Sequence, residues 1–411
     1  MVPFAIQLPI RSADAAVFGC RCLTIACAAL VGAFSLAGCG GDITANEDKL
    51  KSLLIKKWDL KYAGLPGGLT VAIITPGGEY IASSVVGIDS DAHFRGASTT
   101  KSFTAASIML LDQRGLLNID DPLTANIPGR TMPYVPAGPD YAIPFKSQIT
   151  IRQLLEHRAG VFDVGNTDVP LSANVPYAGQ RYVDWVTENL GEQHTFTLNE
   201  MVGVVARNQL SHSPPGSSFH YSNTGYSLAA KVVEQVSGKS LAQFVKDEFV
   251  VPLGLGKTTF PDDGNLQTLP VPFFEGTTKS GGKYYPTTNR NVSWGVGEGN
   301  VIITPLNLAR WIRHLVNGET SLNAGQVKRM RACSQTFEVH VLYGLGIECY
   351  PTDLGDGHNG AITGYLTLAR HDSKTNVTVV AFASLLDADD LAGQSVLVIE
   401  TARAARTLFG Y

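Results

Sequence analysis

The stretch that most constrains the fold is a predicted helix that starts close to Ser98. Residues 103–113 are apolar on nearly all sides, and a helix of this kind lies inside a protein core. Gly115 follows where the C-terminal end of a helix favours glycine. The chain must therefore build a large core around this helix. Ser98 and Lys101 lie at its start, three residues apart, and so share one face.

A serine beside a lysine can form a nucleophile and its base. Burial disfavours the charged form of a lysine and so lowers its pKa, and the neutral amine can then accept the proton of a hydroxyl group. The spacing Ser-x-x-Lys is weak evidence alone, because Ser280-Gly-Gly-Lys283 repeats it in a stretch whose composition predicts an exposed loop. Other motifs must decide which of the two Ser-x-x-Lys sequences belongs to a site.

Two later motifs carry residues suited to the same chemistry. Tyr221-Ser222-Asn223 lies between a Pro-Gly loop and a helix predicted at 225–236. A tyrosine there can point its hydroxyl into a cleft or pack in the core. Gly357-His358-Asn359-Gly360-Ala361 is predicted to be a loop before a strand at 364–370. By itself, His358 would be a structural loop histidine.

Several other kinds of site are not indicated. The sequence has no His-Glu-x-x-His and no spaced Cys/His cluster, so we expect no metal. It lacks the Gly-x-Ser-x-Gly elbow of α/β-hydrolases. No P-loop or dinucleotide fingerprint is present, and we expect no cofactor.

The N-terminus has the pattern of an export signal. Arg11 and Arg21 precede an apolar stretch, residues 23–36, which is short for a membrane span. It ends in Leu36-Ala37-Gly38-Cys39, which resembles the lipobox of bacterial lipoproteins. The resemblance implies a signal peptide at 1–38, lipid on Cys39, a short tether at 39–48 and one large domain at 49–411. We therefore expect an exported, membrane-anchored protein that faces the periplasm from a bacterial cell envelope; an ordinary secretory signal is the alternative.

Charge and cysteine content bear on the partners and on a possible disulfide. The formal net charge is −4, and no basic run is present, so nucleic acid is not an expected partner. Cys333 and Cys349 are the two cysteines beyond residue 39. In an oxidising compartment they could form a disulfide, or they could remain separate buried thiols. Composition gives no oligomeric state.

The order of elements indicates an α+β fold. An amphipathic helix at 49–61 and two strands at 69–75 and 79–88 open the domain, while strands at 364–370 and 377–385 and a helix at 395–408 close it. Between them lies a region rich in loops and helices, with helices predicted at 151–156, 198–208, 225–236 and 240–251. We predict one antiparallel sheet formed by both chain ends, flanked by helices, with a helix-rich and loop-rich subdomain inserted between.

Taken together, the three motifs resemble the serine β-lactamase and penicillin-binding-protein superfamily. They are Ser98-x-x-Lys101, Tyr221-Ser222-Asn223 and His358-Asn359-Gly360, in that order. The branch they are most similar to contains class C β-lactamases, D-alanyl-D-alanine carboxypeptidases and β-lactamase-like esterases. Further stretches also look like this family: 117–123, 149–157, 252–255 and 343–346.

The resemblance implies a role for each matched residue. Ser98 would be the acylated nucleophile, Lys101 the amine that helps to deprotonate it, and Tyr221 the acid/base for the leaving group and for water. The backbone N–H groups of Ser98 and Ala361 would form the oxyanion hole.

The implied substrate-binding residues are Asn223, His358, Asn359 and Gly360. Asn223 would hold the substrate amide or the lysine. His358 stands where many relatives have lysine, and Asn359 replaces the usual Thr or Ser, which makes recognition of a free carboxylate less certain. Glu298 also departs from the family, in a Gly-Glu-Gly where relatives show a plainer turn; we expect a surface carboxylate there.

Two classes of function follow from this resemblance. The first is a serine hydrolase that cleaves an amide, lactam or ester through an acyl-enzyme. It would resemble a D-alanyl-D-alanine carboxypeptidase or β-lactamase and act on a small molecule or a peptidoglycan peptide, with a β-lactamase-like carboxylesterase as the alternative. The second is a non-turnover protein that binds cell wall or senses penicillin. The intact motifs favour the enzyme, although fold alone does not decide function.

Overall fold

The computed structural model describes residues 39–261, 268–336, 342–350 and 353–411, with backbone only for 39–42. The predicted signal peptide at 1–38 and the Cys39 side chain lie outside the described part. Within the described residues no helix combines the length and apolar character needed to span a bilayer.

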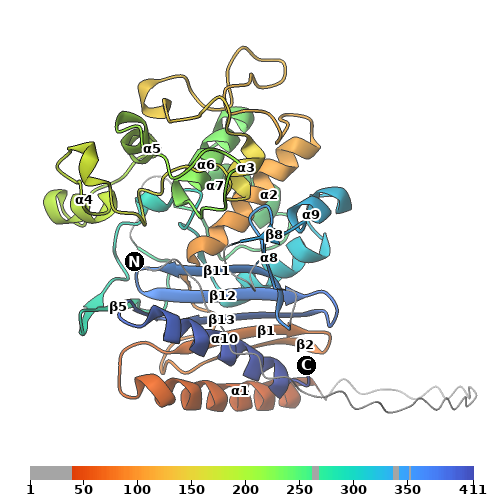
Figure 1. The fold of residues 1–411 in the computed structure, drawn as a ribbon. Helices are drawn as coiled ribbons and strands as arrows, with labels where there is room; N and C mark the ends of the chain where they lie inside the picture. Colours follow the sequence, from red (N-terminus) through yellow and green to blue (C-terminus); the bar gives the residue numbers. More distant parts are fainter. Residues whose placement is uncertain (1–38, 262–267, 337–341, 351–352) are drawn as a thin grey trace, which may run out of the picture.

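An eight-stranded antiparallel sheet forms the centre of the molecule (Figure 1). Its spatial order is β2-β1-β13-β12-β11-β10-β9-β8. The bounds are β1 Leu69–Thr75, β2 Gly78–Ser83, β8 Ser334–Gln335, β9 Leu342–Tyr343, β10 Glu348–Tyr350, β11 Gly355–Ile362, β12 Tyr365–Asp372 and β13 Val377–Ala383. Strands from both chain ends pair directly, because β1 lies between β2 and β13. The predicted α+β fold is confirmed.

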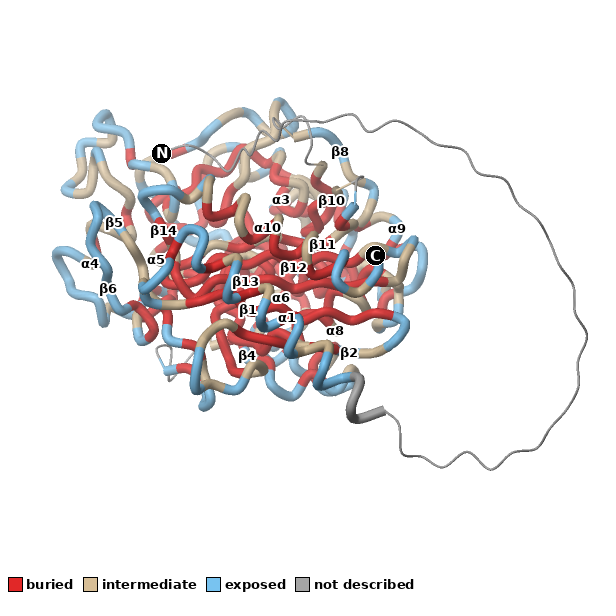
Figure 2. Tube along the Cα trace, turned by 90° about the horizontal axis from the view of Figure 1, so that it is seen from below, coloured by how far each residue is buried: buried red, intermediate tan, exposed pale blue. Residues whose placement is uncertain are grey.

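The inner strands are apolar on both faces because both faces are covered. All seven residues of β1 are buried, and so are all seven of β13. Leu69, Val71 and Ile73 pack with α1 and α10, whereas Ala72 and Ile74 face the core formed with α2 and α8, as the two-residue period of a strand requires. Figure 2 shows this burial along the central strands.

Helices form the two covering layers and the inserted region. The helices are α1 Cys39–Tyr62, α2 Thr100–Gln113, α3 Ile151–Leu155, α4 Tyr182–Leu190, α5 Leu198–Arg207, α6 Asn223–Ser237, α7 Leu241–Val245, α8 Pro305–Asn317, α9 Ala324–Met330 and α10 Leu391–Leu408. Shorter turns are η1 Ala97–Thr99, η2 Pro139–Tyr141, η3 Leu171–Ala173, η4 Lys246–Val250 and η5 Ser293–Gly295. In Figure 1, α1 and α10 lie below the sheet, and α3 to α7 form the upper region.

Two small sheets complete the fold. Their strands are β3 Phe94–Arg95, β4 Thr258–Thr259, β5 Thr277–Ser280, β6 Lys283–Pro286, β7 Ile302–Ile303 and β14 Leu385–Asp387. The order β3-β7-β4 brings the segment before Ser98 against residues from the middle of the chain, and β14-β5-β6 attaches a hairpin to the C-terminal part.

The structure differs from the predicted elements in several places. Residues 39–48 are the first turns of α1 instead of a tether, and Glu47 Oε1 ties this part to β2 by accepting the Ile81 N–H at 3.1 Å. β2 ends at Ser83 and does not continue to 88. The helix predicted at 240–251 is divided into α7 and a π-helical turn, η4. Helix α4 and the strands β8 to β11 were not predicted.

Candidate active site

Ser98 lies in η1, at the start of the buried helix α2. The turn is held by hydroxyl groups: Thr99 Oγ1 donates to Gly96 O at 2.8 Å, and Thr100 Oγ1 donates to Ala97 O at 2.7 Å. Ala97 has a left-handed φ of 53°, which costs a residue other than glycine on the order of 1–3 kcal/mol. These bonds fix a strained turn that leaves Ser98 partly exposed at the edge of the core.

Lys101 is fully buried, and its ammonium group meets three oxygens. Nζ lies 3.2 Å from Ser98 Oγ, 2.6 Å from Asn223 Oδ1 and 2.8 Å from the backbone oxygen of Glu298. Burial lowers the pKa of Lys101 to about 8, although nearby carboxylates act in the opposite direction. A useful fraction of neutral amine therefore exists at mildly alkaline pH, beside a hydroxyl whose proton it can accept.

Tyr221 and Asn223 are placed by the start of α6. Ser222 caps this helix, because its Oγ accepts the Gly225 N–H at 3.1 Å. The ring centroid of Tyr221 lies 4.8 Å from Lys101 Nζ. Burial raises the pKa of Tyr221 well above its usual value, and a hydrogen bond with Ser98 acts in the opposite direction. Tyr221 therefore keeps its proton at neutral pH and can donate it.

Glu298 does not lie on the surface, and that prediction is wrong. The residue is only 3% exposed, and its Oε2 lies 3.6 Å from Lys101 Nζ. The reason is the loop from Gly295 to Asn300, which folds over the start of α2 and is held there by a bond from Thr104 Oγ1 to Gly297 O at 2.7 Å. Burial raises the pKa of Glu298 to about 7, while Lys101 acts to lower it.

His358 lies on strand β11, and the prediction of a loop there is wrong. Seven residues of β11 pair with β12, from Asp356 to Ile362. His358 Nδ1 faces the backbone oxygen of Asn359, so Nδ1 carries the proton, and Nε2 accepts the hydroxyl proton of Tyr343 at 2.8 Å. Burial lowers the pKa of His358 to about 4. The residue is neutral, 1% exposed, and has no nitrogen left for a substrate.

Asn359 has a fixed orientation because a buried arginine holds it. Arg370 Nη2 donates to Asn359 Oδ1 at 2.8 Å. Arg370 can only donate, so the atom facing it must be the amide oxygen. The amide nitrogen of Asn359 has no hydrogen-bond partner among the described residues and can donate to a substrate. The charge of Arg370 is matched by an ion pair with Glu348.

Gly360 lets strand β11 approach the nucleophile closely. A Cβ atom at Gly360 would lie 2.7 Å from Gly96 O and 3.0 Å from Ser98 N. The side chain of Glu348 accepts the Asn359 N–H. Backbone N–H groups alternate in direction along a strand, so the N–H of Ala361 points to the same side of β11 as that of Asn359. The pairing of β10 with β11 ends at Gly357, so β10 does not cover the N–H of Ala361. The N–H groups of Ser98 and Ala361 are therefore both available near the Ser98 hydroxyl.

The structure keeps the second Ser-x-x-Lys apart from this cluster. Ser280 and Lys283 are exposed and form the turn of the β5–β6 hairpin. The Ser280–Lys283 pair therefore lacks the buried surroundings of Ser98 and Lys101.

Sequence reasoning gave no role to two buried residues of the site. Asp163 Oδ2 accepts the Asn223 N–H at 3.2 Å, and His157 Nδ1 accepts the Ser222 N–H at 3.1 Å. Both therefore position the segment that carries Tyr221. His157 belongs to a stretch that resembles the family, but a lone histidine or aspartate gave no signal of this role.

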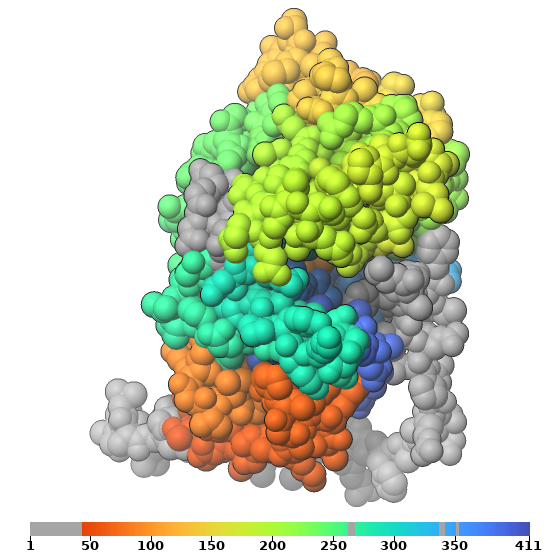
Figure 3. Space-filling view, turned by 90° about the vertical axis from the view of Figure 1, so that its left-hand side faces the viewer, coloured from red at the N-terminus to blue at the C-terminus, as the bar shows by residue number. Residues whose placement is uncertain are grey.

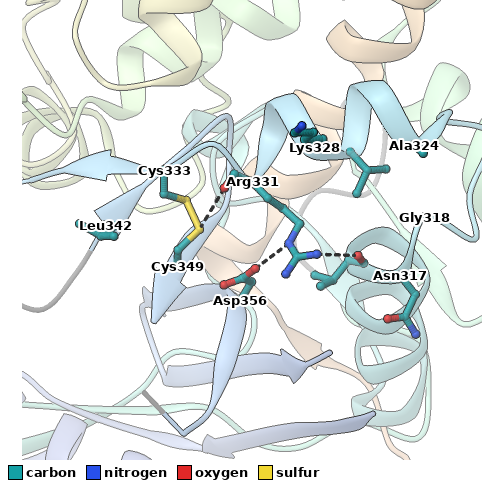
Figure 4. A pocket seen from close by; sticks show the side chains of 11 residues that line it. Asn317, Gly318, Ala324, Lys328, Arg331, Cys333, Leu342, Cys349 and Asp356 are labelled. Atoms are coloured by element: carbon teal, nitrogen blue, oxygen red, sulfur yellow. Dashed lines mark hydrogen bonds and ion pairs between the residues drawn. A yellow bond between two sulfur atoms is a disulfide. The ribbon is translucent and has the colours of Figure 1, made fainter. Parts of the chain in front are cut away.

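One face of the molecule is hollowed (Figure 3). In Figure 3, the segment coloured yellow-green overhangs the teal segment, and a recess lies between them. A separate cavity of about 600 Å³ lies next to Cys333 and Cys349, which are joined by a disulfide. Figure 4 shows Arg331 in this cavity, where its Nε donates to Asp356 Oδ2 at 2.6 Å. Ser98, Lys101 and Tyr221 do not line it.

Comparisons with known proteins agree with this geometry. A model of the Beta-lactamase family matches residues 62–402. The D-stereospecific amidohydrolase from Streptomyces sp. is similar with a TM-score of 0.70 and 25% identity, over 87% of this chain and 98% of that one. The D-amino acid amidase from Ochrobactrum anthropi SV3, complexed with D-phenylalanine, has a TM-score of 0.69 and 21% identity, over 89% of this chain and 99% of that one. The second similarity shows the fold alone.

A curated relative matches over a shorter segment. Penicillin-binding protein 4* of Bacillus subtilis (strain 168) is 31% identical over 167 residues, which are 40% of this chain and 30% of that protein. The match thus spans less than a third of that relative's length. The family match over most of the chain shows that this protein belongs to the Beta-lactamase family, and the similarities support a serine hydrolase.

Proposed function

We propose that the protein is a serine hydrolase that cleaves an amide bond through an acyl-enzyme on Ser98. The observation that carries this proposal is the contact of 3.2 Å between Ser98 Oγ and the fully buried Nζ of Lys101. A hydroxyl next to a desolvated amine is the arrangement that an activated serine needs.

The proposed reaction uses groups of four residues. Lys101 accepts the proton of Ser98 as Oγ bonds to the substrate carbonyl carbon, and the carbonyl oxygen takes up the displaced electron pair. The N–H groups of Ser98 and Ala361 stabilise this oxyanion. Tyr221 gives its proton to the leaving nitrogen as the C–N bond breaks, and Lys101 returns a proton to Tyr221. Water then attacks the acyl group by the reverse sequence, with Tyr221 as base.

The charges at β11 favour a substrate without a free carboxylate on its leaving side. His358 is neutral, Asn359 offers an amide N–H, and the charge of Arg370 is matched by Glu348. A charged donor to a carboxylate contributes about 1.5–3 kcal/mol, and a neutral one about 0.5–1.5 kcal/mol. The site therefore suits an amide or ester carbonyl, and the similar amidohydrolase is D-stereospecific. Amides of D-amino acids are the first substrates to test.

A matched pair of peptides tests this substrate class. One peptide ends in D-Ala-D-Ala with a free carboxylate, and the other carries a C-terminal amide. We expect a kcat/KM about tenfold or more higher for the amide. Preference for the free acid, or rapid turnover of a chromogenic cephalosporin, would instead support a carboxypeptidase or a β-lactamase. Preference for a p-nitrophenyl ester would support a carboxylesterase, and a burst without turnover would support a penicillin-sensing protein.

Two serine variants control this experiment. Ser98→Ala should abolish hydrolysis of every substrate. Ser280→Ala changes the other Ser-x-x-Lys and should leave every rate unchanged, because Ser280 is exposed in a hairpin turn.

We also propose that the enzyme is anchored in the bacterial cell envelope by lipid on Cys39. The support is the apolar stretch 23–36 followed by Leu-Ala-Gly-Cys. The full chain should partition into the detergent phase, and Cys39→Ser should remain in the aqueous phase. A Cys39→Ser protein that is processed and retained on membranes like the wild type would contradict the anchor.

A further inference from the structure

A carboxylate is buried beside the base of the site, although nothing in the proposed reaction requires one. Glu298 is 3% exposed, and its Oε2 lies 3.6 Å from Lys101 Nζ. A buried carboxylate is costly unless a positive charge compensates it. Lys101 is the partner in that ion pair, so the charge states of these two residues are coupled.

The hydrogen bonds of Lys101 show what happens when it loses a proton. An ammonium group has three donors, and all three face oxygens. Two of these oxygens, Asn223 Oδ1 and Glu298 O, can only accept. The third, Ser98 Oγ, can also donate. In the neutral amine the two remaining N–H groups stay on the acceptors, and the lone pair faces the Ser98 hydroxyl.

We propose that Glu298 is a positioning residue that balances the charge of Lys101 while Lys101 accepts the proton of Ser98. The inference deepens the proposed function and rests on it. The reactive form, which grows as the pH rises through about 8, has Lys101 as an amine and Glu298 as a carboxylate. The proton moves from Ser98 Oγ to Lys101 Nζ as the Oγ–carbon bond forms, which creates an ammonium beside the carboxylate. Lys101 returns to the amine when its proton passes on toward the leaving group.

Six other titratable groups surround the pair. They are Asp163, His157, Tyr221, Tyr226, Glu348 and His358. Burial lowers the pKa of both histidines and raises that of both tyrosines, so all four are neutral. Burial raises the pKa of Asp163, while hydrogen bonds from Asn223, Gly165 and Asn166 act in the opposite direction. Glu348 is paired with Arg370.

Glu298 has two opposite effects on the base. The carboxylate of Glu298 acts to raise the pKa of Lys101. Burial acts in the opposite direction and is the larger effect, so the resulting pKa is about 8. The amine is therefore formed at higher pH than it would be without Glu298. The same carboxylate stabilises the ammonium that acylation creates, so it speeds the step once the amine is present.

The experiment measures covalent labelling of Ser98 by a fluorophosphonate as a function of pH. The oxygen of Ser98 displaces fluoride from phosphorus, so no natural substrate is needed. In the wild type the rate constant should rise with pH through about 8. In Glu298→Gln the midpoint of this rise should shift to lower pH by about one unit. The rate constant at the plateau should fall about tenfold or more. The control is Glu400→Gln, which removes a carboxylate from the solvent side of α10 and should change neither value.

Each outcome decides the inference. A lower plateau with an unshifted pH profile would mean that Glu298 only supports the fold, and would overturn it. If Glu298→Gln unfolds, Glu298→Ala provides the second variant, and the wild-type profile remains a test: a rise at the ordinary lysine value of about 10.4 would contradict it. A wild type that is never labelled would instead contradict the proposed function.

Discussion

Burial sets the protonation of the residues that surround Ser98. The same loss of solvent lowers the pKa of Lys101 and raises that of Tyr221, because it disfavours the charged form of each. In the proposed reaction the base, Lys101, is thus available as an amine while the acid, Tyr221, keeps its proton. Two groups with opposite tasks can therefore lie beside one hydroxyl at the same pH.

Tyr221→Phe should remove the acid and keep the fold, since only the hydroxyl is lost. We expect a fall of about 10²–10⁴-fold, mainly in kcat, which corresponds to about 3–5 kcal/mol of barrier. Steady-state kinetics on the best substrate of the panel, with a thermal melt to confirm folding, measure this. Activity within about threefold of the wild type would show that another group transfers the proton.

His358→Ala should act on stability and leave substrate choice unchanged. The variant removes the hydrogen bond between the Tyr343 hydroxyl and Nε2 of His358, although Tyr343 keeps its hydrogen bond with Tyr226; the loss of one such bond costs about 0.5–1.5 kcal/mol. Because His358 is neutral and buried, the ratio of rates for the D-Ala-D-Ala peptide and its amide should stay the same. A selective loss for the free acid would mean that His358 contacts the carboxylate.

For single residues, the sequence motifs predicted which residues form the site, whereas the charge states of these residues depend on contacts made by the folded chain. Ser98, Lys101, Tyr221 and Asn223 could be named from the sequence because their spacing and order are distinctive. Glu298 was misjudged, since only the folding of its loop over α2 buries it. The pairing of Arg370 with Glu348 joins β12 to β10, and no local pattern in the sequence reports such a contact.

Among the elements, β11 and η1 make the contact on which the site depends. Gly360 allows this contact because a side chain there would collide with Gly96 O and Ser98 N. Gly360→Ala should push the strand away and slow labelling of Ser98 about 10²-fold, with a lower melting temperature. Gly138→Ala is the matched control, because a Cβ there meets no atom within 4 Å. A Gly360→Ala enzyme with the wild-type rate would contradict the account of this contact.

Elements with strong local patterns were predicted, and those set by their neighbours were not. β1, α2 and α10 carry apolar patterns that indicate their type. The predicted bounds of β1 are confirmed at both ends, whereas α10 begins four residues before its predicted start. β11 contains three glycines and reads as a loop; it becomes a strand because β12 pairs with it along seven residues. Its pairing partner on the other side, β10, has only three residues, too few for a pattern.

For the whole molecule, the disulfide between Cys333 and Cys349 closes a loop with a sequence separation of 16. A loop of this size should contribute about 3 kcal/mol to the free energy of unfolding. The double variant Cys333→Ser/Cys349→Ser should therefore unfold at lower denaturant concentration, with unchanged labelling of Ser98. Two alkylatable thiols in the protein purified without reductant would contradict the bridge.

The assignment of Ser98 as the acylated residue is the central claim, and mass spectrometry of labelled protein tests it most directly. The full chain is treated with the fluorophosphonate and digested, and the modified peptide is sequenced. The account predicts one adduct, on Ser98, that is lost in Ser98→Ala and kept in Ser280→Ala. An adduct on Ser280, or labelling that persists in Ser98→Ala, would contradict it.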